Sequence, residues 1–189
     1  MWPEFIHGDH HAKMARAFER VVSGKLKRLI INMPPRHTKS EFASYMLPAW
    51  FLGLNPHKQV MQISHTADMA EGFGRKVRNL VDSDVYHSVF PETRLRRDST
   101  AAARWNTDKN GVYIAMGVGG AVAGKGADLL IIDEGTSALD KKNEDDIVKE
   151  LVILDKNITI IFITHKKRLA KYFDKVYHIK DKKFYKIKG

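Results

Sequence analysis

The chain has 189 residues, of which 43% are hydrophobic, and a formal net charge of +10 at pH 7. This length and apolar content suit one globular domain over residues 1–189 and argue against wholesale disorder. The absence of cysteine excludes disulfides, thiolate zinc sites and cysteine nucleophiles. The first dozen residues carry charge and histidine instead of the apolar core of a signal peptide, and no stretch approaches the roughly 18 to 20 apolar residues of a membrane span. We therefore expect no membrane partner and a soluble protein of cytoplasmic type.

Strands and helices are predicted to alternate along the chain. Helices are expected from about His10 to near Gly24 and in four further segments: SEFASYMLPAWFLG with a kink at Pro48, ADMAEGFGRKVRNLVDS, KNEDDIVKELVIL and KKRLAKYF. Strands are expected at RLIINM, KQVMQIS, GVYIAMG, ADLLIID and NITIIFIT, and a closing β-hairpin at KVYHI and KFYKI. Residues 83–111 are expected to be irregular. Strands separated by helices imply parallel pairing, so the predicted fold is α/β: a three-layer α/β/α sandwich with a mainly parallel sheet.

The segment LIINMPPRHTKSEF predicts a strand, a tight loop and a helix that opens at Lys39 and Ser40. Backbone N–H groups at such a helix N-terminus face phosphate oxygens and are helped by the helix dipole. In a phosphate loop, Lys39 reaches the β and γ phosphates of a nucleotide and the Ser40 hydroxyl ligates Mg²⁺. The usual pattern, G-x-x-x-x-G-K-[ST], has glycine where this chain has Met33 and Thr38. A plain polar loop between strand and helix is therefore the alternative.

A second element, LLIIDE, predicts a buried strand that ends in two acids, Asp133 and Glu134. Charge at a strand end is costly unless it meets a cation, and a Mg²⁺–nucleotide supplies one. Asp133 is expected to hold Mg²⁺, mainly through water, and Glu134 to act as the general base that polarises the attacking water. The two elements together favour a P-loop NTPase that binds ATP and Mg²⁺.

The choice of basic residue changes at Asp133. Residues 1–133 hold 10 Arg and 8 Lys, whereas residues 134–189 hold 1 Arg and 13 Lys, although each part has a net charge of +5. Arginine and lysine do different jobs, so two pieces of different parentage are the simpler explanation, with a local surface bias as the alternative.

Residues 1–134 resemble the ATPase domain of the large terminase subunit, the motor that packages DNA into the capsids of tailed phages. The matching text is INMPPRHTKSEFASYMLPAWFLG, QISHTADMAEGFGRKVRNLVDS and RWNTDKNGVYIAMGVGGAVAGKGADLLIIDE. The resemblance implies that the loop Pro35, Arg36, His37, Thr38, Lys39 and Ser40 binds the nucleotide, with Arg36, Lys39 and Ser40 meeting phosphates and Mg²⁺. It implies that residues 2–11 lie near the adenine. It also implies that the glycine-rich loop GVGGAVAGKGAD faces a neighbouring subunit, where Lys125 replaces an arginine that is common in the family.

Residues 133–189 resemble instead the end of an ABC-transporter ATPase domain. The text DEGTSALD is similar to that family's Walker B motif and D-loop, with Gly135 in place of the commoner proline or alanine, and TIIFITHKKRLAKYFDKVYHIKDKKFYKIKG is similar to its last strands. The resemblance implies that His165 contacts the γ phosphate and that Asp140 belongs to the D-loop; a strand-end histidine satisfied by its surroundings is the alternative for His165. The features typical of each family are incomplete: the sequence is expected to contain no terminase-type nuclease domain with clustered carboxylates, and no L-S-G-G-Q signature precedes Asp133.

These features predict an ATP-binding P-loop NTPase domain in which a terminase-like piece and an ABC-like piece are joined at Walker B. They favour an engineered chimera over a natural protein that has diverged. Hydrolysis is expected to be weak or absent, so the chain is an ATPase only if it turns over. The alternatives are the ATPase motor module of a DNA-packaging terminase without its nuclease, and an engineered chain that tests a fold and has no activity. Weak, non-specific DNA contact through the basic segment 94–104 and the lysine-rich tail is a further expectation, with a solvated basic surface as its alternative.

Overall fold

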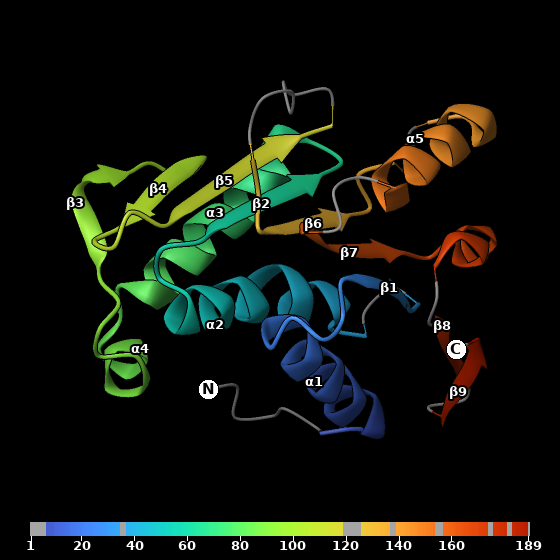
Figure 1. Ribbon diagram of the computed structural model, residues 1–189, viewed down its shortest axis with the longest axis horizontal. Coiled ribbons are helices and arrows are strands. Elements are labelled where there is room, and N and C mark those ends of the chain that lie inside the picture. Colours follow the sequence, from blue (N-terminus) through green and yellow to red (C-terminus); the bar gives the residue numbers. More distant parts are fainter. Residues whose placement is uncertain are drawn as a thin grey trace.

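The computed structural model contains one nine-stranded sheet with helices on both faces (Figure 1). It describes residues 7–34, 37–118, 126–136, 139–153, 157–173, 176–180 and 183–188. The strands follow the spatial order β3-β4-β5-β2-β6-β7-β1-β8-β9. Their bounds are β1 Arg28–Asn32, β2 Gln59–Ser64, β3 Leu95–Thr100, β4 Arg104–Thr107, β5 Val112–Gly117, β6 Leu129–Asp133, β7 Thr159–Thr164, β8 Val176–Lys180 and β9 Lys183–Lys188.

The middle of the sheet is parallel, as the sequence predicts. Strands β5, β2, β6, β7, β1 and β8 pair in parallel, while β3 and β4 on one side and β9 on the other join antiparallel. The predicted C-terminal hairpin is the pair β8–β9. Parallel strands need crossover connections, and helices lie between β1 and β2, between β6 and β7 and between β7 and β8.

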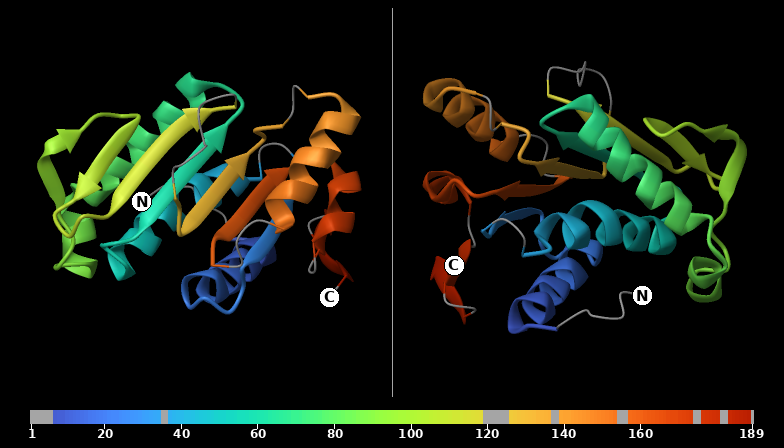
Figure 2. Two further views of the ribbon diagram at one scale, coloured as in Figure 1. Left: turned by 45° about the horizontal axis from the view of Figure 1, so that its top comes forward. Right: turned by 180° about the vertical axis from the view of Figure 1, so that it is seen from behind.

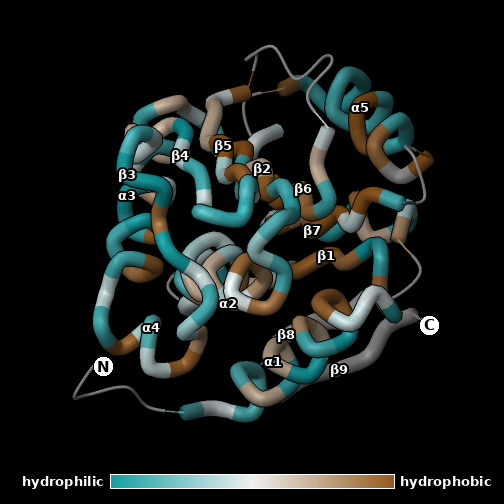
Figure 3. Tube along the Cα trace, turned by 60° about the vertical axis from the view of Figure 1, so that its left-hand side comes forward, coloured by the Kyte–Doolittle hydropathy of each residue, from teal (hydrophilic) through white to brown (hydrophobic). Residues whose placement is uncertain are grey.

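Two separate apolar cores cover the two faces of the sheet. One holds buried side chains from α1 (Asp9–Val22), α2 (Leu47–Leu54), α3 (Ala67–Val81) and α4 (Asp84–Val89), and the other from α5 (Lys141–Ile153) and η2 (Lys167–Tyr172). Successive residues of β7 alternate between them: Ile161 and Ile163 face the first core, Ile160 and Phe162 the second. Figure 2 shows α2 and α3 across one face and α5 across the other, and Figure 3 shows the hydrophobic residues gathered on the central strands. This arrangement is a three-layer sandwich.

Strand β7 joins the two parts of the chain into one sheet. It pairs in parallel with β6 on one side and with β1 on the other. All six of its residues are buried. Strand β7, from residues 134–189, therefore lies between β1, which leads into the predicted phosphate loop, and β6, which ends at Asp133.

The expectation that residues 83–111 are irregular was wrong. Residues 83–111 contain α4, β3 and β4. The helix that opens at Lys39 runs as a π-helix, η1, over Glu41–Met46 before continuing as α2. Pro48 lies in the first turn of α2, and because proline has no N–H the backbone just before it lacks one helical hydrogen bond and can widen. Segment η2 is a 3₁₀-helix.

None of the helices in the described part of the chain is long and apolar enough to cross a membrane.

Candidate functional site

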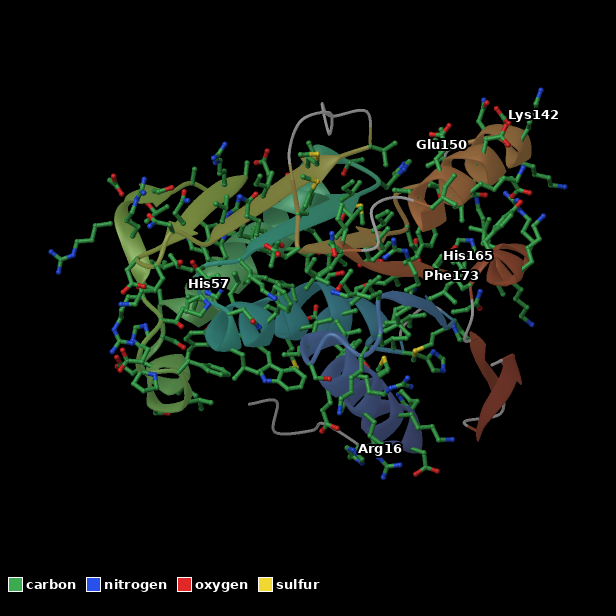
Figure 4. All side chains as sticks on the ribbon, viewed as in Figure 1. Arg16, His57, Lys142, Glu150, His165 and Phe173 are labelled. Atoms are coloured by element: carbon green, nitrogen blue, oxygen red, sulfur yellow. The ribbon has the colours of Figure 1, made fainter. Side chains whose placement is uncertain are left out.

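The predicted site residues come from the carboxyl ends of three neighbouring parallel strands. Strand β1 leads through the loop to Lys39, β6 ends at Asp133 and Glu134, and β7 leads to His165. Carboxyl ends of parallel strands share one edge of a sheet, which is where open α/β folds bind ligands. Figure 4 labels His165 at the end of β7.

Lys39 and Glu134 form an ion pair at the centre of this edge. The Lys39 Nζ lies 3.0 Å from Glu134 Oε1, with the Lys39 side chain 8% exposed and that of Glu134 33% exposed. The Nδ1 of His165 lies 3.7 Å from the same carboxylate oxygen. Partial burial alone would raise the pKa of Glu134, but the Lys39 ammonium and His165 outweigh it and hold that pKa below its ordinary value. Glu134 is therefore ionised at neutral pH and shared by two basic groups.

Asp133 lies deeper than Glu134 and touches hydroxyl groups. Ser44 Oγ donates to Asp133 Oδ2 at 2.9 Å, and this serine is fully buried within the π-helical segment η1. Burial raises the pKa of Asp133, although hydrogen bonds from Ser40 and Ser44 and the charge of Lys39 oppose the rise. Burial thus makes the ionised form of this carboxyl group costly.

The backbone at Thr38 has the conformation that glycine prefers. Its φ is 59°, in the left-handed region, at the position where the usual phosphate-loop pattern has its second glycine. The Thr38 hydroxyl donates a hydrogen bond to the carbonyl of His37 at 2.6 Å and lies 2.8 Å from Nε2 of His11. The ring of His11 in turn stacks on Phe42. Burial and the neighbours His10 and His7 lower the pKa of His11 to about 4. A neutral histidine at the start of α1 thus helps to fix the loop.

The chain turns sharply after Asp133. Glu134 has a φ of 52°, and its N–H donates to the carbonyl of Ile163 in β7 at 3.0 Å. A Cβ added to Gly135 would lie 3.0 Å from Cγ2 of Ile132 and 3.2 Å from Cγ2 of Val118. This crowding gives a physical reason for glycine at position 135.

Some predicted residues lie outside the described part of the chain. These are Pro35 and Arg36 of the loop, Lys125 with most of the glycine-rich loop, and residues 2–6 of the segment expected near the adenine. Asp140 is described: its side chain accepts from the backbone N–H groups of Lys142 and Asn143 and so caps the start of α5.

Two polar contacts at this edge were missed by sequence reasoning. Neither Ser44 nor His11 belongs to a recognisable sequence motif. Ser44 lies one helical turn beyond Ser40, so helical spacing was the signal that could have placed Ser44 on the same side of the helix as Ser40. Two buried polar atoms at the same strand ends, Asn32 Nδ2 in β1 and Ser64 Oγ in β2, have no hydrogen-bond partner among the described residues. Buried polar groups are normally satisfied, so this edge offers free donors to a ligand or to water.

The basic segments expected to touch DNA lie at the two ends of the sheet. Arg96, Arg97 and Arg104 are exposed on β3 and β4 at one end, and the lysine-rich β9 is the last strand at the other. The two segments are therefore separated by the whole sheet.

The chain matches no protein-family model and no curated protein.

Replacing Asp133 by asparagine is expected to stabilise the protein at pH 7. The raised pKa means that the folded state holds the proton of Asp133 more tightly than the unfolded state does, so the cost of ionisation grows as the pH rises above the ordinary value of 3.8 and vanishes only well below it, where both states are protonated. Asparagine keeps an acceptor for Ser44 without the charge. The melting temperature should rise by a few degrees, at about 2–4 °C per kcal/mol for a chain of this size. Thermal melts of both proteins at pH 7 and at pH 4 check this: the gain should shrink at pH 4, and a less stable variant at pH 7 contradicts the argument.

Proposed function

We propose that the chain is an ATP-binding domain of the P-loop NTPase class with weak Mg²⁺-dependent hydrolysis. The observation that carries the proposal is the buried Lys39 at the opening of a helix, 3.0 Å from Glu134 and beside Asp133 at the carboxyl edge of a parallel sheet. A buried ammonium that pairs with one carboxylate and acts electrostatically on a second, at the same strand ends as Asn32 Nδ2 and Ser64 Oγ, donors without a partner among the described residues, matches what a bound polyphosphate and its cation require.

The residues present fit Mg²⁺ and a nucleotide. Mg²⁺ binds proteins through one or two carboxylates together with waters and substrate phosphates, and Asp133 and Ser40 are the carboxylate and hydroxyl that would hold it. When bound, the ion supplies positive charge against the phosphate oxygens. Lys39 would exchange Glu134 for those oxygens, and Glu134, freed, would accept a proton from water. His165, beside Glu134, would donate a hydrogen bond to the terminal phosphate.

We also propose that a terminase-like piece and an ABC-like piece meet at Glu134. The support is topological: β7, from the second piece, lies between β1 and β6 of the first, and all three run parallel. A joint at the end of β6 keeps the sheet continuous. The resemblance to two families on either side of that joint, and the change from arginine to lysine there, are the sequence support.

Titration calorimetry with ATP and Mg²⁺ tests nucleotide binding directly. Saturable binding that requires Mg²⁺ is the expected result. No heat and no competition by ATP against a fluorescent nucleotide analogue would favour an engineered fold without activity.

Replacing Glu134 by glutamine is expected to remove hydrolysis and to tighten ATP binding. Loss of a general base typically slows turnover by about 10²–10⁴-fold. The tighter binding follows because Lys39 would no longer have to break its ion pair with an ionised Glu134 before it could contact the phosphates. An ion pair of this exposure is worth roughly 1 kcal/mol, which corresponds to about five-fold in affinity. Calorimetry and phosphate-release assays measure both. Unchanged affinity would show that the Lys39–Glu134 pair does not compete with ATP, and unchanged turnover would remove Glu134 from the mechanism.

A further inference from the structure

A buried cluster of charges lies behind the loops that carry Glu134 and His165. Its centre is Glu144, in the first turns of α5, whose side chain is 0% exposed. Thr136 Oγ1 donates to Glu144 Oε1 at 2.5 Å, Lys166 Nζ donates to both carboxylate oxygens at 3.1 and 3.0 Å, and Arg168 donates to Oε2. We call Glu144, Thr136, Lys166 and Arg168 the Glu144 cluster.

The cluster connects two segments that come from different strands. Thr136 follows Glu134 by two residues after β6, and Lys166 directly follows His165 after β7. Lys166 Nζ also lies 3.4 Å from the carbonyl oxygen of Thr136. The Glu144 carboxylate therefore links the segment that follows Glu134 to the segment that follows His165, through its hydrogen bonds with Thr136 and Lys166.

Stability alone is a weak reason for such a cluster. Replacing buried ion pairs by packed apolar side chains is often neutral or stabilising. The turn it supports is a costly one, because Glu134 has a positive φ, and non-glycine residues in that region persist only where surrounding contacts hold them. Geometry at a reacting centre, by contrast, must be held closely: a displacement of about 1 Å can cost 10²-fold in rate.

We propose that Glu144 is a positioning residue that holds Glu134 and His165 side by side through Thr136 and Lys166. Glu144 itself touches neither of them and acts through its two neighbours. The catalytic consequence rests on the proposed function, whereas the tether itself does not.

The test uses three single variants of the full chain and one double variant. Thr136→Val removes the link to the Glu134 segment and Lys166→Met the link to the His165 segment. Arg168→Met is the control: it removes another cation of the same carboxylate, partly exposed like Lys166 (30% against 23%), together with an ion pair to Asp145, and Arg168 is not adjacent in sequence to either site residue. Glu144→Gln combined with Lys166→Met removes the buried carboxylate charge together with one of its cations and guards against misfolding of a single variant.

Amide hydrogen exchange reads the tether without any nucleotide. The N–H of Glu134, bonded to Ile163, should exchange about ten-fold faster or more in Thr136→Val and Lys166→Met and stay close to wild type in Arg168→Met. Steady-state ATPase assays read the consequence: kcat should fall about ten-fold in the first two variants, with the affinity for ATP unchanged because Lys39 is untouched, and stay near wild type in the control.

The outcomes separate the two proposals. A wild type that hydrolyses no ATP sinks the proposed hydrolysis, and the exchange measurement still decides on the tether. Unchanged exchange at Glu134 in the first two variants, or equal acceleration in all three, would overturn the positioning role. The positioning role would also be overturned if Thr136→Val, Lys166→Met and Arg168→Met all lowered kcat in proportion to the stability that each variant loses.

Discussion

Replacing Lys39 by alanine is expected to weaken Mg·ATP binding by about 30-fold or more while the fold is retained. The ammonium is almost fully buried at the edge where the phosphates would lie, and it already carries an ion pair with Glu134. Losing one partner of a buried, hydrogen-bonded charge pair costs roughly 2–5 kcal/mol, which is about 30-fold to several thousand-fold in affinity. Under the proposed function, Lys39 would supply the positive charge that faces the phosphates.

The control for this variant is Lys149→Ala. Lys149 pairs with Asp146 three residues earlier on α5, and both side chains are more than half exposed, so the pair is worth little. Calorimetry should give this control the affinity of the wild type. Equal affinity for ATP in Lys39→Ala and in the wild type would show that Lys39 is not a phosphate ligand.

Circular dichroism decides whether Lys39→Ala still folds. Its loss removes a positive charge that favours the ionised form of the buried Asp133, so a somewhat lower melting temperature is expected. A cooperative melt together with lost binding assigns the effect to the contact with the nucleotide.

The central strands were predictable because they are apolar without interruption. Buried parallel strands such as β6 and β7 read as continuous hydrophobic runs, and both are buried along their whole length. Acids that follow such a run directly, as Asp133 and Glu134 do, are conspicuous. The same logic placed Lys39 at a helix opening after β1.

Strands β3 and β4 could not be seen in the same way. Four of the six residues of β3 are exposed, and β4 has only four residues, so neither gives an alternating or continuous apolar signal. Their formation depends on neighbours that a local pattern does not contain: Trp105 in β4 packs on Tyr113 of β5 with ring centroids 5.0 Å apart. Antiparallel pairing with β5 decides the structure of this segment.

The polar contacts of the site were hidden for a related reason. The Glu144 cluster joins residues that are 8 to 30 positions apart in the sequence, and α5 shows Glu144 among several other acids. Nothing in the pattern KKNEDDIV distinguishes the buried carboxylate from the exposed ones. Only the packing of α5 against η2 selects it.

Expressed separately, residues 1–133 and 134–189 are each expected to be unfolded or insoluble. Strand β1 pairs with β7 and β8 in the described sheet, and both belong to the second fragment. The first fragment would therefore lose both partners of β1 and leave the edge of β6 open, and open apolar edges favour aggregation. The second fragment would have to cover both faces of β7 with one helix, a 3₁₀ turn and a hairpin.

The side chains of β7 give the scale of the effect. Ile160, Ile161, Phe162 and Ile163 are each at most 1% exposed, and fully burying one such side chain is worth about 1.5–3 kcal/mol. Four of them contribute roughly 6–12 kcal/mol, which is comparable with the whole stability of a domain, about 5–15 kcal/mol. Neither fragment can keep that burial, since the first lacks the strand and the second lacks the helices α1, α2 and α3 that cover one of its faces.

The intact chain should consequently melt in one cooperative transition, and the two fragments should regain structure only together. Circular dichroism melts of the full chain, of each fragment and of the two fragments refolded as an equimolar mixture test this. The mixture should recover a single transition below that of the intact chain, because association of two chains costs entropy that a covalent joint avoids. A soluble first fragment with a sharp melt of its own would mean that β1 can pair with β6 directly, and that β7 is an addition to a fold complete without it. The proposal that the joint at Glu134 completes a shared sheet would then fail, whatever the protein does with ATP.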